Sequence, residues 1–127
     1  MELLEQTLED FSAAAQDSEH MYHEIAIALL EAYQQASIGK GAARHAQEKP
    51  FRLQRMQSLA KGQGHWGGLS YQVCKKVQEA ERLPTPEQRI AEVHGAIVYC
   101  AGIITYIRNE VAEESGGSSI SPQHPKQ

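Results

Sequence analysis

The stretch "LPTPEQRIAEVHGAIVYCAGIITYIRNEVAE", residues 83–113, decides the fold. Thr85, Pro86 and Gln88 stand in the order of a helix N-cap, a first-turn proline and a capping-box residue. We therefore predict a helix that begins at Pro86 and ends at about Glu113.

This helix has too many apolar residues for a single buried stripe, so we expect it to be covered on more than one side. They are Ile90, Val93, Ile97, Val98, Ala101, Ile103, Ile104, Ile107 and Val111. The small residues that would let another helix approach closely are Gly95, Ala96, Ala101 and Gly102. Because a chain of 127 residues has few other elements to cover such a helix, we expect a homo-oligomer.

The preceding residues also have helical periodicity, and a chain with only 6% aromatic residues favours helix over sheet. The apolar stripe of a first helix is Leu4, Leu8, Phe11 and Ala15. We expect Asp17 and Ser18 to cap a second helix, and Gly39 and Gly41 to end it. Its expected buried face is Met21, Ile25, Leu29, Ala32 or Tyr33, and Ala36.

Two more helices lie between these and the last one. Pro50 opens a short helix whose inward residues are Met56, Leu59 and Ala60. After glycines at 62, 64, 67 and 68, a longer helix has Leu69, Val73, Val77 and Ala80 on one face. The predicted fold class is therefore all-α: a small helical domain, residues 1–114, with two long C-terminal helices that form a homo-oligomer. A Gly-, Ser- and Pro-rich tail, residues 115–127, is predicted to be disordered.

The charge is distributed unevenly along the chain, whose net charge is −4. The segment "GKGAARHAQEKPFRLQRMQSLAKG", residues 39–62, has six basic residues and one acid, whereas residues 1–38 have eight acids and no Lys or Arg. Acidic flanks oppose the steering of a nucleic acid polymer, so we expect no such partner. A small anion in a local pocket fits the short basic segment better.

The compartment is expected to be the cytoplasm, without a membrane partner. The start of the chain is acidic, unlike a signal peptide. The longest apolar run, Gly95–Ile107, has 13 residues, fewer than the ~20 that span a bilayer. Cys74 and Cys100 lie in apolar helical patterns, and we expect both to be buried thiols in a reducing compartment.

Arrangements for metal binding or catalysis are weak in this sequence. His20, His23 and Glu24 have a spacing that can present a metal, but without a further ligand a solvated helix face is the favoured interpretation. The all-α nucleotide pyrophosphohydrolases bind magnesium through paired carboxylates on two helices. The Glu2/Glu5 and Glu110/Glu113 pairs have part of that spacing, but neither aspartate of the chain follows a Glu by three. We predict no catalytic residue, metal or cofactor, and keep this enzyme class as an alternative.

Several runs of the sequence resemble a family of small phage proteins. They are "GKGAARHA" (39–46), Phe51 with Gln54, "YQVCKKVQEAERL" (71–83) and "EVHGAIVYCAG" (92–102). The family includes the first class of anti-Thoeris sponge proteins, and the resemblance covers roughly residues 39–107. This chain departs from the family pattern at Ala42 and Ala43, where polar residues are expected, and at Arg55, where a proline is expected.

The resemblance implies a phage protein that evades immunity by binding and not by catalysis. Such proteins sequester the cyclic ADP-ribose isomer of Thoeris defence, and related members bind cyclic oligonucleotides. They are helical homodimers or larger rings such as hexamers, with pockets at subunit contacts. A protein-interaction module that blocks a host factor is the remaining alternative.

The expected ligand-binding residues combine this resemblance with the charge pattern. They are Arg44, His45, Phe51, Gln54, Trp66, Tyr71, Lys75, Lys76, Glu79 and Arg82. Arg44 and Lys75 would pair with phosphate, and Phe51 or Trp66 would stack on the base. Glu79 would either accept a hydrogen bond from a ribose hydroxyl or hold Arg82 in an ion pair.

Overall fold

The computed structural model describes residues 2–38 and 49–120, with side chains up to Ser115. These residues form α-helices and one short 3-10 helix, Phe51–Leu53, and no strand. The α-helices are α1 (Glu2–Gln16), α2 (His23–Ser37), α3 (Arg55–Gln63), α4 (Gly67–Ala80) and α5 (Pro86–Ile120). The predicted all-α class is confirmed.

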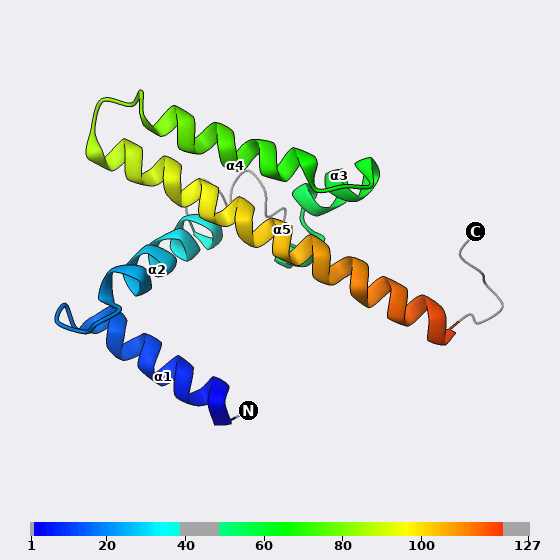
Figure 1. Ribbon diagram of the computed structural model, residues 1–127, viewed down its shortest axis with the longest axis horizontal. Coiled ribbons are helices and arrows are strands. Elements are labelled where there is room, and N and C mark those ends of the chain that lie inside the picture. Colours follow the sequence, from blue (N-terminus) through cyan, green and yellow to red (C-terminus); the bar gives the residue numbers. More distant parts are fainter. Residues whose placement is uncertain (1, 39–48, 121–127) are drawn as a thin grey trace.

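Every other part of the fold is arranged around α5, the longest helix (Figure 1). α4 runs antiparallel beside its N-terminal half, and α3 packs against both. α2 crosses α5 on another side, and α1 packs against α2. The N-terminal pair of helices thus projects from a body made by α3, α4 and α5.

The predicted start of α5 is confirmed, but its end is not. The Gln88 backbone N–H donates to Thr85 Oγ1 (3.1 Å), and the Thr85 hydroxyl donates to Gln88 Oε1 (3.2 Å). These bonds satisfy a free N–H group of the first turn. The helix continues past Glu113 to Ile120, through the first part of the expected tail; residues 121–127 lie outside the described chain.

The main core lies where α3, α4 and α5 meet. Its buried residues are Met56, Ala60, Leu69 and Tyr106. Gly102 makes this packing possible, because a Cβ there would lie 2.7 Å from the Met56 sulfur. Gly95 similarly accepts the Lys76 side chain, 2.8 Å from the place of a Cβ. These small residues therefore serve approaches within one chain, while the expected homo-oligomer stays a proposal.

The expected buried face of α2 is wrong for its large residues. Met21 is 80% exposed and Tyr33 68%, and Ile25 and Leu29 are exposed too. Of the two alternatives at the next position, Ala32 is the buried one, and Ala36 is half-buried. Ala26, which was not part of the expected face, is also buried. Small side chains on the contact faces allow neighbouring helices to approach closely, which leaves the large apolar side chains of α2 in solvent.

Asp17 and Ser18 do not cap α2, because the helix begins later, at His23, after Tyr22 as the N-cap residue. Asp17 Oδ1 instead accepts a hydrogen bond from the Glu19 backbone N–H (2.9 Å) in the turn after α1. The expected helix end at Gly39 and Gly41 lies outside the described residues.

His20 and His23 do not lie on a solvated face. His20 Nε2 lies 3.1 Å from Asp10 Oδ1, and His23 Nδ1 lies 2.7 Å from the Ala14 carbonyl oxygen. Both side chains thus join the beginning of α2 to α1. Among the described residues, no three His, Cys, Asp or Glu side chains are grouped so as to hold a metal ion.

Three further expectations about burial are wrong. Leu59 on α3 and Val77 on α4 are exposed. Cys74 and Cys100 are free thiols and also exposed, because each lies on a helix face turned away from the α4–α5 contact. Met56, Ala60, Leu69 and Ala80 are buried as expected.

Two helix glycines provide a matched test of the core. In a helix interior, replacing Gly by Ala stabilises the helix by up to about 1 kcal/mol. A Cβ at Gly62 meets nothing within 4 Å, so Gly62→Ala should stabilise the protein by about 0.5–1 kcal/mol. Gly102→Ala should instead destabilise it by about 1–2 kcal/mol, because Met56 must move. Urea denaturation measures both; equal stabilisation by the two variants would contradict this packing.

Candidate functional site

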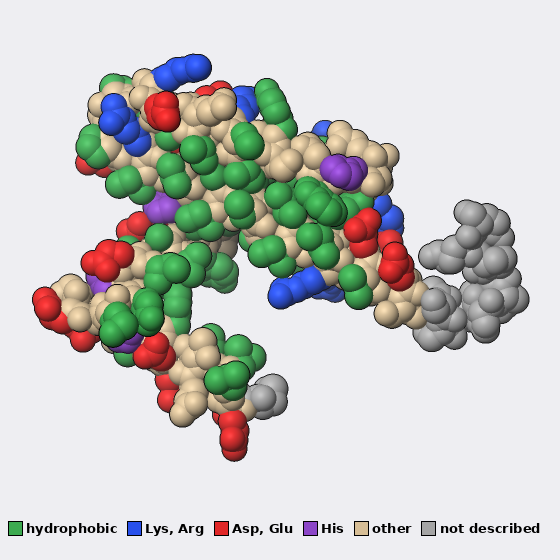
Figure 2. Space-filling view, viewed as in Figure 1, with side chains coloured by type: hydrophobic (Ala, Val, Ile, Leu, Met, Phe, Trp, Pro, Cys, Tyr) green, Lys and Arg blue, Asp and Glu red, His purple; other side chains and the backbone are tan. Residues whose placement is uncertain are grey.

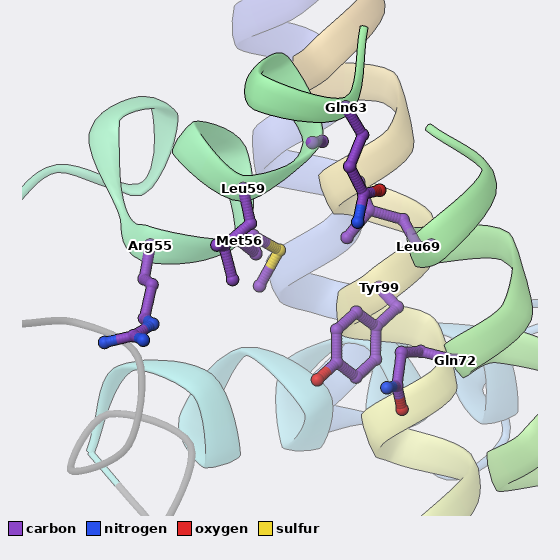
Figure 3. A pocket seen from close by; sticks show the side chains of 9 residues that line it. Arg55, Met56, Leu59, Gln63, Leu69, Gln72 and Tyr99 are labelled. Atoms are coloured by element: carbon purple, nitrogen blue, oxygen red, sulfur yellow. The ribbon is translucent and has the colours of Figure 1, made fainter. Parts of the chain in front are cut away.

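A pocket of about 500 Å³ opens between α3, the start of α4 and the middle of α5 (Figure 3). This volume lies within the roughly 300–1,000 Å³ that is typical of small-molecule sites. Its lining residues are Arg55, Met56, Leu59, Ala60, Gln63, Gly68, Leu69, Gln72 and Tyr99. Beside the pocket, Gly102 allows Met56 of α3 to pack closely on α5.

The lining combines an apolar floor with polar groups at the edges. Met56 and Leu69 belong to the core and form part of the floor. In Figure 3 the Arg55 guanidinium lies on one side of the pocket and the Tyr99 ring on the other, with Gln72 beside Tyr99. A guanidinium pairs with phosphate, an aromatic ring stacks on a base, and amides bond to base edges. The pocket therefore has the chemical groups that a nucleotide requires.

Lys76 lies in the contact between α4 and α5, beside the pocket residue Tyr99. Its Nζ lies 3.7 Å from Glu92 Oε2 and 6.0 Å from the centroid of the Tyr99 ring. Its stem packs over Gly95. The ammonium thus already has an acidic partner on α5, and Lys76 holds α4 against α5 next to the pocket wall.

Other predicted site residues pack in the core or bond to the nearby backbone. Phe51 and Trp66 pack against the main core, and the Trp66 ring meets the Tyr106 ring edge-on at 6.2 Å between centroids. Gln54 precedes α3, and its Nε2 donates to the Lys49 carbonyl oxygen (2.8 Å). None of the three lines the pocket in the described part of the chain.

The remaining predicted residues of α4 do not gather at the pocket. Tyr71 and Lys75 lie on its exposed face. Glu79 lies at the other end of α4, roughly 16 Å along the helix from Gly68. Arg82, which was expected on the same helix, lies beyond its end at Ala80. The described ion pairs do not include Glu79 with Arg82, so that alternative explanation of the pair is not supported.

Arg44 and His45 lie outside the described residues, so their role stays a prediction. Of the glycines before and at the start of α4, Gly68 lines the pocket. The backbone N–H of its neighbour Gly67 already donates to His65 Nδ1 (2.8 Å). That amide is therefore not open to a phosphate.

Sequence reasoning missed the residues that line the pocket. Arg55 belongs to the basic segment and departs from the family pattern, but neither feature predicts a site role for it. Gln72 and Tyr99 lie in runs that carry the resemblance, without a predicted role, and Gln63 lies in none of these runs. The available signal was the position of Arg55 at the first turn of a helix next to buried Met56, which places a cation at the edge of a core.

A second cavity, of about 340 Å³, lies on the other side of α3 against the C-terminal half of α5. Gln57, 4% exposed, donates from Nε2 to the Gly102 carbonyl oxygen (2.8 Å), while its Oε1 has no partner in the described chain. Lys61 Nζ lies 2.6 Å from Glu113 Oε2, and this bond raises the pKa of Lys61. Burial, and then the nearby Glu110 carboxylate, raise the pKa of Tyr106. These contacts attach α3 to α5.

The comparisons with known proteins add nothing to this geometry. No family model, curated protein or solved structure matches the chain. The resemblance drawn from the sequence motifs therefore stays an expectation.

One helix is long and apolar enough to cross a membrane by length and composition. It is the Pro86–Ser115 part of α5, with mean hydropathy 1.6 in its most apolar window. The apolar run Gly95–Ile107, which alone is too short to span a bilayer, is therefore part of a longer apolar helix. The core helix of a soluble protein can meet the same criterion, so this is weak evidence for a membrane location.

Lys76 offers a test that separates packing from charge. Lys76→Met keeps the stem over Gly95 and should cost less than about 1 kcal/mol of unfolding free energy. Lys76→Ala also removes the stem and should cost about 1 kcal/mol more. Lys75→Ala, on the exposed face of the same helix, should change stability by about 0.5 kcal/mol or less. Equal urea midpoints for the Met and Ala variants would show that the stem does not contribute.

Proposed function

We propose that this protein binds and sequesters a cyclic nucleotide signal without cleaving it. The resemblance indicates a phage anti-defence protein of the anti-Thoeris type, acting in the bacterial cytoplasm on a cyclic ADP-ribose isomer or a cyclic oligonucleotide. In this proposal the protein is a homo-oligomer, and it requires no metal, cofactor or nucleic acid polymer.

The pocket between α3, α4 and α5 carries the proposal. Arg55 would pair with a phosphate, the Tyr99 ring would face the base, and Gln63 and Gln72 would bond to polar edges of the ligand. A compact cyclic nucleotide presents these groups on a rigid frame, so little conformational entropy is lost on binding.

Sequestration needs no acid, base or nucleophile at the pocket. Among the described residues, the pocket lining includes no carboxylate, histidine or cysteine. The carboxylates of the alternative enzyme are far apart in sequence, on α1 and the C-terminal half of α5, and Glu113 bonds to Lys61. These observations favour binding, and the pyrophosphohydrolase alternative is decided by experiment.

The direct test is recovery of the ligand. A cyclic ADP-ribose isomer or a cyclic dinucleotide is incubated with excess protein, the protein is denatured, and the released nucleotide is analysed by mass spectrometry. Intact ligand, withheld until denaturation, would support sequestration. A linear or hydrolysed product would favour the enzyme, and no thermal shift with any cyclic nucleotide would favour the protein-interaction module.

A charge at the pocket edge should account for a measurable part of the affinity. A charge-assisted phosphate contact contributes roughly 1.5–3 kcal/mol, so Arg55→Ala should weaken binding about tenfold to a hundredfold in calorimetry. Lys49→Ala, an exposed lysine before Pro50, is the matched control and should leave affinity unchanged. If Arg55→Ala binds as tightly as the unmutated protein, this pocket is not the site.

Arg44 tests the role of the glycine-bounded segment. If its guanidinium binds a phosphate, Arg44→Ala should weaken binding about tenfold to a hundredfold without changing the oligomeric state. Calorimetry with size-exclusion chromatography and light scattering measures both properties. Unchanged affinity would remove the segment from the site and leave Arg55 as the relevant cation.

A further inference from the structure

An apolar stripe runs along α5 on a face that the described residues leave largely exposed. Its residues alternate three and four positions apart, which is the a/d pattern of a coiled coil over about three heptads. They are Ile90, Val93, Ile97, Cys100, Ile104, Ile107 and Val111. We call this set the α5 seam; at 1.5 Å per residue it is about 32 Å long.

The seam is open to solvent in the single chain. Ile90 is 53% exposed, Ile104 50% and Val111 57%. Figure 2 shows hydrophobic side chains gathered over the middle of α5 and over α2. Ile97, in the middle of the seam, is half-buried. Exposed apolar surfaces of this kind mark interaction sites in soluble proteins.

The chain's own contacts use the other faces of α5. Glu92, Tyr99 and Tyr106, seven residues apart, face α4 and α3. On the side toward α2, the Ala91 carbonyl oxygen accepts a hydrogen bond from Gln35, and His94 Nε2 lies 3.3 Å from Glu31 Oε1. These contacts lie on faces of α5 other than the seam.

We propose that the α5 seam pairs with the seam of a second copy of this chain, in antiparallel orientation. This proposal rests on the homo-oligomer of the proposed function and specifies its contact surface, helix orientation and register. In an antiparallel pair each a position lies opposite a d position. The register that uses the seam fully places Ile97 against Cys100 of the partner subunit, and Val93 against the partner's Ile104. Ile90 then meets the partner's Ile107.

Charges beside the seam select this orientation. In the stated register Glu87 lies beside Arg108 of the partner subunit, and Arg89 beside the partner's Glu110; twofold symmetry repeats both pairs. Neither Glu87 nor Arg108 has an ion-pair partner among the described residues. A parallel pair would instead place Arg89 beside the partner's His94 and Ile103 beside its Arg108. Flanking charges contribute little energy but decide orientation in coiled coils.

A bilayer is a poorer fit to the same surface. α4 lies along the N-terminal half of α5 and carries Lys75, Lys76 and Glu79. Inserting α5 would bring these charges into the hydrocarbon or strip α4 from the helix it packs against, and charged groups at bilayer depth are costly. A second copy covers the apolar face and leaves α4 in water.

The first experiment reverses the charges of one pair in the full chain. Glu87→Arg and Arg108→Glu should each weaken dimerisation about tenfold in sedimentation equilibrium, because each removes two symmetric attractions and creates like-charge contacts. The double variant should return to within about threefold of the unmutated protein, because the pair is restored with exchanged signs. If the double variant dimerised no more tightly than either single variant, the register would be overturned. If the unmutated protein were a monomer at about 100 µM, the highest concentration used, the proposal itself would be overturned.

The second experiment reads the orientation by disulfide formation. In a Cys74→Ser/Cys100→Ser background, Val93→Cys with Ile104→Cys should form an interchain disulfide on mild oxidation. Val93→Cys alone should not, since the two copies of residue 93 lie roughly 16 Å apart along the helices in this register. Cross-linking by the single variant would show a parallel pair and overturn the orientation.

Co-flotation of the unmutated protein with phosphatidylcholine vesicles would favour the bilayer and overturn the proposal. No nucleotide is present in either experiment, so their failure is distinct from failure of the binding function.

Discussion

The fold depends on one constraint: α5 is apolar around most of its circumference, and a helix of this kind is stable in water only when it is covered. α4 covers one face over its N-terminal half, α2 covers a second, and α3 covers the middle beyond α4. Each cover must come close enough to exclude water. Gly95 and Gly102 allow that approach, one beneath the Lys76 stem and the other beneath Met56.

Polar groups within the apolar part of α5 have partners on the covering helices. Glu92 lies near Lys76 of α4, and His94 near Glu31 of α2. A half-buried polar group without a partner would cost free energy, so these contacts favour the observed rotation of α5 relative to its neighbours. The carbonyl of Gly102 similarly accepts a hydrogen bond from buried Gln57 of α3. The polar contacts thus specify an arrangement that apolar burial alone would leave loose.

Local signals predicted the helices well, and the contact faces poorly. The Thr85–Pro86–Gln88 order gave the start of α5 because a cap requires only neighbouring residues. The buried face of α2 was predicted mainly from large apolar residues, which are exposed, whereas the small Ala26 and Ala32 are buried. Periodicity shows that a helix has an apolar face, but it does not show whether that face packs against the same chain. The exposed large residues of α2 are one such case.

The candidate site was harder to predict for a related reason. Arg55, Gln63, Gln72 and Tyr99 come from three helices, and only the angle between α3 and α4 brings them to one pocket. A motif can be recognised when its residues are close in sequence, and these are not. Phe51 and Trp66 were predicted to stack on a base because they are aromatic, but both pack against the main core.

The pocket and the α5 seam share a helix but not a face. Tyr99 lines the pocket, whereas the adjacent Cys100 belongs to the seam, and a step of one residue turns a helix by about 100°. A partner on the seam therefore does not cover the pocket. Coupling between ligand binding and assembly would have to pass through the rotation of α5, and the Lys76–Glu92 and His94–Glu31 pairs oppose that rotation. The geometry thus favours binding and assembly as separate properties of one helix.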